Sequence, residues 1–310
     1  MLNGYHVYYT YPSTEAKNPY EPINILVQLA SALHWRKFFG PIHLYCDETH
    51  LAVLREYGVD SVYDSINLDL LSHMPPVDRR YWAFSKIYLA QHLLKTQSNL
   101  VLVDTDLWVS GPLESFDPTL AVQALHTELY DVEHPYTPYI EPFYFKFDGK
   151  GFDGWDWTIL PINCAFLYLN DVELVNEWYR RCLEIIETNL ETQDYGGSRE
   201  MVFMEQRLLP TLADRMNKRV GTVLQVSFNT CLPFDSEEPV NPWYPPFDSS
   251  PELSKFETII KHVWGRKKHY GEKKARTSII ETVINDLRKN FTIEELAYYT
   301  PLIDECVAFM

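Results

Sequence analysis

Short apolar runs alternate with segments of helical periodicity through the first half of the chain. Residues His6 to Thr10 and Pro41 to Cys46 are typical of strands, and Ile23 to Phe38 between them is typical of a helix. The run Leu100 to Val103 is apolar without alternation, as in a strand that is buried on both faces. Helices that cross over between parallel strands produce this order of elements. We therefore expect an α/β fold with a mixed, mostly parallel central sheet flanked by helices.

The same pattern continues further along the chain. Thr49 to Tyr57 and Trp82 to Leu94 place apolar residues at helical intervals, while Ser61 to Tyr63 favours a short strand. Ile162 to Leu169 returns to a strand-like pattern, and Val172 to Ile186 has the spacing of an amphipathic helix. The α/β pattern therefore extends well into the second half of the sequence.

Two segments rich in proline and aromatic residues interrupt this pattern. Residues 130–157 and 232–251 show neither helical nor strand periodicity, so we expect elaborated loops or hairpins there. There is no internal repeat and no low-complexity linker, and helical periodicity returns near the C-terminus. We expect one domain over residues 1–270 and a C-terminal helical extension over residues 271–310 that packs on it.

The charge balance is strongly acidic, because 27 Lys and Arg stand against 43 Asp and Glu, a formal net charge of −16 over 310 residues. A surface of this charge repels phosphate polymers, which argues against nucleic-acid binding as the main function. No stretch approaches the roughly 18 to 20 continuous apolar residues of a membrane span, and the first residues lack a basic segment followed by an apolar one. We expect a cytoplasmic protein without a membrane span.

Five cysteines stand singly along the chain, at Cys46, Cys164, Cys182, Cys231 and Cys306. Their odd number and the absence of a Cys-x-x-Cys pair argue against a disulfide framework and against a thiolate zinc site. We expect them to be small buried side chains in a reducing compartment.

Two carboxylates follow the buried strand directly, in Asp104-Thr105-Asp106. Ligands of open α/β sheets bind beyond the carboxyl ends of strands, and side chains two residues apart on extended backbone point to the same side. Burial of both carboxylates without a counter-charge would be costly. The pair is therefore a candidate for holding one divalent cation. The alternative, two solvated acids in a turn, stays open at this point.

A second polar segment lies far downstream, where His262 precedes Gly265 and then Lys267 and Lys268. An imidazole can ligate a metal, a glycine permits close approach of the backbone, and lysines can bind phosphate oxygens. A mixed carboxylate and imidazole site suits Mn²⁺ better than Ca²⁺. The basic stretch Arg266 to Arg276 is either a solvated approach to a helix or a surface that faces anionic lipid headgroups.

With these segments in view, the chain resembles the retaining sugar-nucleotide transferases of the GT-A fold, specifically the glycogenin and bacterial lipopolysaccharide galactosyltransferase family. That family carries an Asp-x-Asp after an apolar strand and a late His-x-x-Gly-x-x-Lys, which here are Asp104 to Asp106 and His262 to Lys268. Three further segments fall in the family's order: Phe84-Ser85-Lys86, Pro161 to Asn170, and Phe203 to Leu209. The likeness spans most of the chain, from Tyr5 to Lys268.

The resemblance implies roles for individual residues. Asp104, Asp106 and His262 would ligate Mn²⁺ or Mg²⁺, and the metal would neutralise the diphosphate leaving group of a nucleotide-sugar donor, most simply a UDP-sugar. Contacts with the donor would come from a larger set, namely Thr10, Lys86, Asp104, Thr105, Asn163, Gly265 and Lys268. Glu205 or Gln206 would lie on the face of the sugar opposite the leaving diphosphate and stabilise an oxocarbenium-like transition state. Covalent catalysis by this residue and front-face attack both stay open.

The chain also departs from the family pattern. His269-Tyr270 stands where the family has Pro-Trp, Cys164 replaces a glycine, and Glu205 replaces the aspartate of an Asp-Gln pair. These differences concern the sugar pocket and the acceptor more than the metal. Structural interpretations stay open as well: Lys86 extending from an amphipathic helix, Asn163 capping a turn, and His262 as a satisfied core histidine.

The sequence therefore predicts a metal-dependent glycosyltransferase of polysaccharide biosynthesis that moves a hexose to a saccharide or lipid-linked saccharide hydroxyl, with retention by resemblance. A lipid-linked acceptor would bring the basic residues 266–276 to the inner face of a membrane. Two alternatives stay open. One is a non-catalytic saccharide-binding protein on the same fold; the other is a sugar-phosphate nucleotidyltransferase, whose Gly-rich basic signature is missing after the first strand.

Overall fold

The computed structural model describes residues 2–10, 20–77, 81–113, 115–128, 156, 158–189, 201–224, 227–228, 260–263 and 271–310. Its chain divides into two compact units. Unit 1 consists of residues 1–69, 103–112 and 238–310, and unit 2 of residues 70–102 and 113–237. Nearly all of the two predicted loops, 130–157 and 232–251, lies outside the described residues.

The main strands of unit 1 are parallel and lie in the order β3-β2-β1. They are β1 (Gly4–Tyr8), β2 (Ile42–Cys46) and β3 (Ser65–Asn67). Helix α1 (Glu21–Phe38) connects the first two, and α2 (Glu48–Glu56) follows the second. A separate antiparallel pair joins β5 (Leu107–Val109) to β11 (Ile260–His262). The predicted metal ligand His262 is the last residue of β11, and β5 begins directly after Asp106, another predicted ligand.

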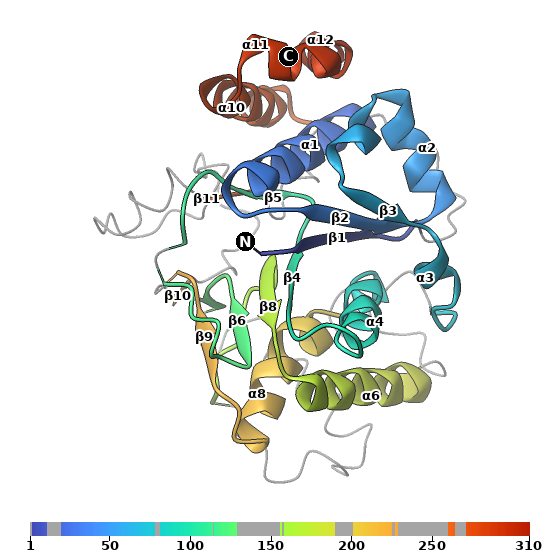
Figure 1. Cartoon of the computed structure of the whole chain (residues 1–310), viewed down its shortest axis with the longest axis vertical. Coiled ribbons are helices and arrows are strands. Elements are labelled where there is room, and N and C mark those ends of the chain that lie inside the picture. The colour runs from blue at the N-terminus through green and yellow to red at the C-terminus, as the bar shows by residue number, and fades with distance from the viewer. Residues whose placement is uncertain are drawn as a thin grey trace. The chain divides into compact units, whose positions relative to one another are not determined.

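Helix α1 is enclosed on two sides. It packs on β2 and β5, and its other face meets the C-terminal helices α10 (Lys273–Asn290) and α12 (Thr300–Ala308). Figure 1 shows these helices on the side of α1 that is turned away from β1 and β2. Between them lie the short helices α11 (Ile293–Leu296) and η5 (Ala297–Tyr299). Because both faces are covered, α1 is apolar nearly all round rather than along one stripe.

Unit 2 carries strands in the order β4-β8-β6-β9, with β6 antiparallel to β8 and parallel to β9. They are β4 (Leu100–Val103), whose last residue belongs to unit 1, β8 (Phe166–Leu169), β6 (Val122–Ala124) and β9 (Val220–Thr222). A parallel pair of two-residue strands joins β7 (Thr127–Glu128) to β10 (Ser227–Phe228). The helices are α4 (Phe84–Leu93), α6 (Val172–Asn189) and α8 (Leu208–Arg215), with a short α3 (Asp69–Ser72) at the boundary between the units.

The predicted fold class is confirmed, with mostly parallel strands flanked by helices and a helical C-terminus. The strand predicted at Ser61 to Tyr63 is wrong, because residues Val59–Val62 form the 3-10 helix η1. Gly58 begins it in the left-handed conformation, with φ of 70°. The amide of Tyr63 then donates to the carbonyl of Asp60, so the strand can begin only at Ser65.

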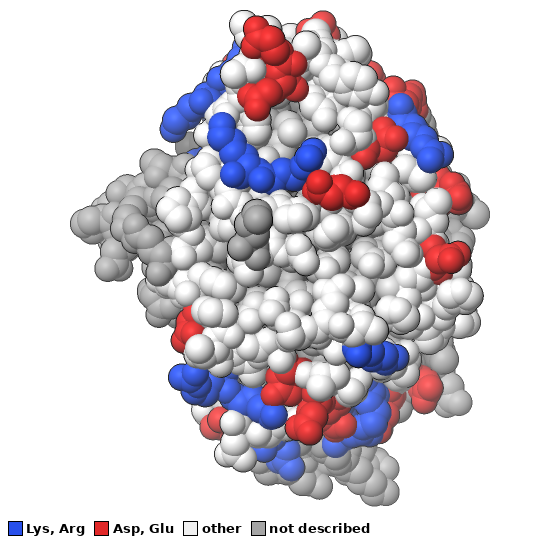
Figure 2. Space-filling model, viewed as in Figure 1, with Lys and Arg blue, Asp and Glu red and all other residues white. Residues whose placement is uncertain are grey.

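The structure also bears on the cysteines, on membrane-spanning helices and on the distribution of surface charge. Cys46, Cys164, Cys182 and Cys306 are buried free thiols, as predicted, whereas Cys231 lies outside the described residues. None of the helices in the described ranges has the length and apolar character needed to cross a membrane. On the face drawn in Figure 2, the basic side chains of the described residues lie among acidic ones rather than in a field of one sign.

A chain of buried polar side chains connects α2 to the start of β5 within unit 1. His50 Nε2 lies 3.1 Å from Gln28 Oε1, and Gln28 Nε2 donates to the hydroxyl of Tyr63 at 2.7 Å. That hydroxyl lies 2.9 Å from His6 Nδ1, and His6 Nε2 lies 3.0 Å from Ser31 Oγ. These five side chains therefore form one continuous series of hydrogen bonds.

At the Ser31 end of this series, the direction of the hydrogen bonds follows from the contact of Ser31 with the backbone. Ser31 donates its single hydroxyl proton to the carbonyl oxygen of Leu107 and therefore accepts from His6 Nε2. In the neutral form of His6, Nδ1 then accepts from the hydroxyl of Tyr63. Burial lowers the pKa of His6 to about 3, with the Asp106 carboxylate opposing the shift, and burial lowers the pKa of His50 to about 4. Burial thus keeps both histidines neutral, and the hydrogen bonds are compatible with this state.

Gly4 provides a stability test of the contact between β1 and α1. A Cβ atom at Gly4 would overlap the indole of Trp35 and lie 2.8 Å from Ile42 Cδ1. We expect Gly4→Ala to lower the free energy of unfolding by about 1 to 3 kcal/mol, because the core must shift to admit a methyl group. Urea unfolding measures the change. Gly271→Ala is the control, since its Cβ would meet only the hydroxyl of Tyr20 at 3.8 Å; equal effects of the two substitutions would contradict the close packing.

Because both histidines are neutral in the folded protein, we expect the stability to decrease as the pH is lowered. Below pH 6.5 the unfolded chain binds protons at His6 and His50 that the folded chain does not bind, so the free energy of unfolding decreases as the pH drops. Between pH 7 and pH 5 we expect a loss of about 2 kcal/mol from each histidine. Urea unfolding at both pH values should show a dependence that His50→Gln roughly halves and that substitution of the exposed His73 leaves unchanged. A flat profile would contradict the neutral assignment.

Candidate functional site

The two carboxylates of Asp104-Thr105-Asp106 lie in a tight turn between β4 and β5. The amide of Leu107 donates to the carbonyl oxygen of Asp104 at 3.1 Å, which closes the turn. The sequence argument assumed an extended backbone here, and this assumption was wrong. The turn itself brings the two side chains together. Asp104, Thr105 and Asp106 are all half-buried.

His262 is brought to this turn by the antiparallel pairing of β5 with β11. In this register His262 lies opposite Leu107, and the amide of Val263 donates to the carbonyl oxygen of Asp106 at 3.0 Å. His262 Nε2 lies 3.5 Å from Asp106 Oδ1, with side-chain exposures of 6% and 15%. One ligand atom from each of Asp104, Asp106 and His262 lies within 4.8 Å of the other two. The predicted set of three metal ligands is thus assembled within unit 1.

The chemistry of this donor set fits a divalent cation. Two ligands of one octahedral ion at bond lengths of about 2.1 Å are separated by about 3 to 4.2 Å, so small side-chain rotations would complete the site. Carboxylate oxygens with one imidazole suit Mn²⁺ or Mg²⁺ better than a thiolate-seeking metal. Three protein ligands would also leave positions of an octahedral ion for other oxygens. We call these residues the Asp-Asp-His cluster.

A second polar cluster lies in unit 2 and is built around Lys86 on α4. The ammonium group of Lys86 lies 2.5 Å from Glu205 Oε1 and donates to the carbonyl oxygen of Cys164 at 3.2 Å. Both side chains are 7% exposed. Lys86 is therefore a buried partner of Glu205 rather than a surface lysine on an amphipathic helix.

Asn163 belongs to the same part of unit 2. Its side-chain oxygen accepts from the amide of Ala165 at 3.1 Å, an Asx-turn, and its side-chain nitrogen donates to Glu128 Oε1 at 3.1 Å. The sequence analysis left open that Asn163 caps a turn, and the structure shows this role for its side-chain oxygen. Asn163 is 2% exposed.

Glu205 and Gln206 lie in a single π-helical turn, η3 (Phe203–Arg207), that runs directly into α8. The amide of Leu208 donates to the carbonyl oxygen of Phe203, five residues earlier, as in a π-helix. In this wider turn the carbonyl oxygen of Met204 accepts a hydrogen bond from Trp178 Nε1 at 2.7 Å. The carbonyl oxygen of Gln206 accepts one from the amide of Ile162 at 3.0 Å. The family resemblance implied a helix start here, and π-turns of this kind are frequent at functional sites.

The remaining predicted residues fall into two groups. Thr10 is exposed, and its amide donates to the carboxylate of Asp47 in unit 1. Gly265, Lys268 and residues 266–270 of the basic stretch Arg266 to Arg276 lie outside the described residues. The structure therefore brings together Asp104, Asp106 and His262 in one unit, and Lys86, Asn163 and Glu205 in the other.

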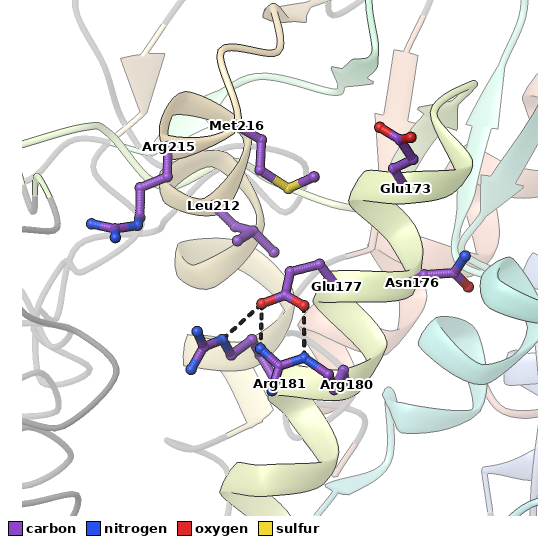
Figure 3. A pocket seen from close by; sticks show the side chains of 8 residues that line it. All are labelled: Glu173, Asn176, Glu177, Arg180, Arg181, Leu212, Arg215 and Met216. Carbon is purple, nitrogen blue, oxygen red and sulfur yellow. Dashed lines mark hydrogen bonds and ion pairs between the residues drawn. The ribbon is translucent and has the colours of Figure 1, made fainter.

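A shallow pocket in unit 2 involves none of the predicted residues. Figure 3 shows it between α6 and α8, with Leu212 and Met216 near its floor and charged side chains around it. Arg180 and Arg181 both donate to Glu177, at 2.7 Å and 3.0 Å, as ordinary helical ion pairs. These charges are thus matched on the helix itself, and we assign the pocket no role.

The sequence analysis missed the residues that hold the Asp-Asp-His cluster in place. Ser31 on α1 donates to the carbonyl oxygen of Leu107 and lies 3.4 Å from that of Asp104. Asp286 on α10 accepts from Trp108 and Ser110 at the other end of β5. A signal for Ser31 was present, because Gln28, Ser31 and His34 interrupt an otherwise apolar helix.

Comparison with known proteins gives one family and several solved structures. No curated protein matches the sequence. The glycosyltransferase GlyE of Streptococcus pneumoniae TIGR4 is similar at 13% identity and a TM-score of 0.35, over 72% of this chain. The chain spans only 45% of the length of GlyE.

Two other solved structures are similar to the same degree. Mouse xyloside xylosyltransferase 1 has 10% identity and a TM-score of 0.36, over 70% of this chain and 82% of its own. The galactosyltransferase LgtC, in complex with donor and acceptor sugar analogs, has 14% identity and a TM-score of 0.38, over 83% of this chain and 94% of its own.

The family match covers far more than half of the chain. The model of a family of unknown function, DUF6734, matches residues 21–292, which include the Asp-Asp-His cluster and the Lys86 and Glu205 pair. The protein is therefore a member of the DUF6734 family.

Proposed function

We propose that this protein is a metal-dependent glycosyltransferase of the GT-A type. It would transfer a hexose from a nucleotide-diphosphate sugar, most simply a UDP-sugar, to a hydroxyl group of a saccharide or lipid-linked saccharide. The observation that carries the proposal is the Asp-Asp-His cluster, in which three potential ligands from distant segments lie within 4.8 Å of one another. The order of the sequence motifs around it supports the same function.

The residues of the cluster suit a metal that is shared with a substrate. The backbone carbonyls of Asp104 and Asp106 are engaged by the amides of Leu107 and Val263, so the turn is held while both carboxylates serve as ligands. A bound Mn²⁺ or Mg²⁺ would neutralise charge on the diphosphate as its bond to the sugar breaks. Ions of this kind are commonly held by one or two carboxylates and complete their coordination with phosphate oxygens.

The roles of the unit 2 residues are proposals from the resemblance, refined by their contacts. Lys86 engages both Glu205 and the carbonyl of Cys164, which favours a role in orienting Glu205 over direct contact with phosphate. We assign Glu205 or Gln206 to stabilisation of positive charge on the donor sugar, with retention of configuration. Asn163 would act beside them through its remaining amide proton.

A lipid-linked acceptor would be approached through the basic stretch Arg266 to Arg276. Of the basic stretch Arg266 to Arg276, only residues 271–276 are described. Lys273 and Lys274 are exposed there, while Arg276 donates to the carbonyl oxygen of Phe309 at 2.8 Å. Peripheral contact with anionic lipid would rest on these two lysines and on the residues before them.

Calorimetric titration of UDP with and without Mn²⁺ tests the donor site. We expect UDP to bind only when Mn²⁺ is present, and GDP to bind more weakly. Asp106→Asn should weaken UDP binding by about 100-fold or more, because even residues that only support a metal ligand contribute about 10- to 100-fold.

Asp304→Asn provides the matched control, since it makes the same chemical change at an exposed carboxylate on α12. UDP binding by this variant should equal that of the wild type. Binding of UDP by the wild type without any metal would contradict the metal assignment. Absence of nucleotide binding under all conditions would contradict the transferase and leave saccharide binding alone as the better account.

A double-mutant cycle tests whether Lys86 and Glu205 act as one unit. Lys86→Met should lower the free energy of unfolding by about 3 to 5 kcal/mol, because it leaves the carboxylate of Glu205 buried without its counter-charge. Adding Glu205→Gln should restore a large part of this loss, since the buried charge is then removed as well. Thermal and urea unfolding of the two single variants and the double variant measure the coupling. Strictly additive effects would show that the pair is not coupled.

A further inference from the structure

Asp286, near the C-terminal end of α10, accepts two hydrogen bonds with one carboxylate oxygen, which also lies close to the ring of His34. Oδ2 accepts from Trp108 Nε1 at 2.6 Å and from Ser110 Oγ at 3.0 Å, and it lies 3.2 Å from His34 Nε2. The side chain of Asp286 is 11% exposed, and that of His34 is fully buried. Burial by itself would raise the pKa of Asp286, but the contacts from His34, Trp108 and Ser110 outweigh it and lower that pKa. A carboxylate so placed fixes Trp108 and Ser110 relative to each other and to α10.

One of these donors, Trp108, lies in the strand that begins beside the Asp-Asp-His cluster, and the other, Ser110, directly follows that strand. Trp108 is the central residue of β5, two positions after Asp106, and it is 1% exposed. Lys261 lies opposite Trp108 in the pairing with β11, and His262 lies opposite Leu107. Any shift of β5 therefore moves Asp106 directly and His262 through the ladder.

The third side chain at Asp286, that of His34, lies on α1 one turn after Ser31. Ser31 engages the carbonyl oxygen of Leu107, at the first residue of β5, and His34 meets Asp286 near the far end of the strand. His34 Nδ1 lies 2.7 Å from the carbonyl oxygen of Ala30 and donates to it, which holds the ring in place on its own helix. Strand β5 is thus held at its start by α1 and at its far end by α10.

We propose that Asp286 is a positioning residue for the Asp-Asp-His cluster, so that the C-terminal helix α10 forms part of the support of the metal site. The proposal rests on the proposed function, since it concerns the same metal. Without the carboxylate, the indole of Trp108 and the hydroxyl of Ser110 lose their common acceptor. β5 is then free to shift against α1, and the separation between Asp106 and His262 is no longer fixed.

Binding of Mn²⁺ alone, followed by electron paramagnetic resonance without any nucleotide, tests the proposal. We expect Asp286→Ala to weaken Mn²⁺ binding by about 10- to 100-fold, the range found for residues that orient metal ligands. Asp286→Asn should weaken it less, because the carboxamide oxygen still accepts from Trp108 Nε1. The spectrum of the Mn²⁺ that remains bound should broaden in Asp286→Ala, as the ligand geometry becomes less uniform.

Two variants on the same helix separate positioning from stability. Glu281→Gln removes an exposed carboxylate, and Val283→Ala creates a cavity at a fully buried side chain. We expect Val283→Ala to lower the unfolding temperature while Mn²⁺ affinity stays at the wild-type level, measured well below that temperature. Glu281→Gln should change neither quantity.

The outcomes distinguish this inference from the function on which it rests. Wild-type affinity in Asp286→Ala would overturn the positioning role and leave the metal site intact. An equal loss of affinity in Asp286→Ala and Val283→Ala would also overturn it, since metal binding would then follow stability. Failure of the wild-type protein to bind Mn²⁺ would overturn the proposed function and this inference together.

Discussion

Unit 1 depends on the burial of α1, whose apolar residues are covered by strands on one side and by the C-terminal helices on the other (Figure 1). Polar side chains on a helix enclosed in this way are stabilised by partners within the core. Gln28, Ser31 and His34 find theirs in Tyr63, in the carbonyl of Leu107 and in Asp286. The hydrophobic effect that buries α1 therefore also dictates where the turn of Asp104 and the strand β5 lie.

The two units accommodate negative charge in different ways. In unit 2 the buried carboxylate of Glu205 has an internal counter-charge, the ammonium group of Lys86 at 2.5 Å. In unit 1 two half-buried carboxylates share a turn, and Asp106 lies 3.5 Å from the imidazole of His262, which would itself be a ligand. Like charges this close repel each other unless a cation lies between them. This difference is the physical reason to place a metal in unit 1 and a fixed, oriented carboxylate in unit 2.

Membership in a family of unknown function means that the activity must be argued from the site. The proposed chemistry follows from the donor set, because two carboxylates on one turn and the imidazole of a paired strand would suit a metal that is completed by phosphate oxygens. A helix distant in sequence lies close to this cluster. Trp108 and Asp286 are 178 positions apart, yet they form a hydrogen bond of 2.6 Å, two positions after Asp106.

The sequence by itself determined the elements whose signal is local. Leu100 to Val103 is recognisable as a buried strand because four apolar residues follow one another, and the two carboxylates after it mark its end. Where a local signal was ambiguous, as at Ser61 to Tyr63, the left-handed Gly58 decided against the strand. Only the tertiary structure could show that Glu205 meets Lys86, 119 positions away, or that Asn163 uses its side chain to cap a turn. It alone paired His262 with Asp106 and placed Asp286 against Trp108, because strand register and helix packing are set by the burial of the whole core and not by any neighbouring residues.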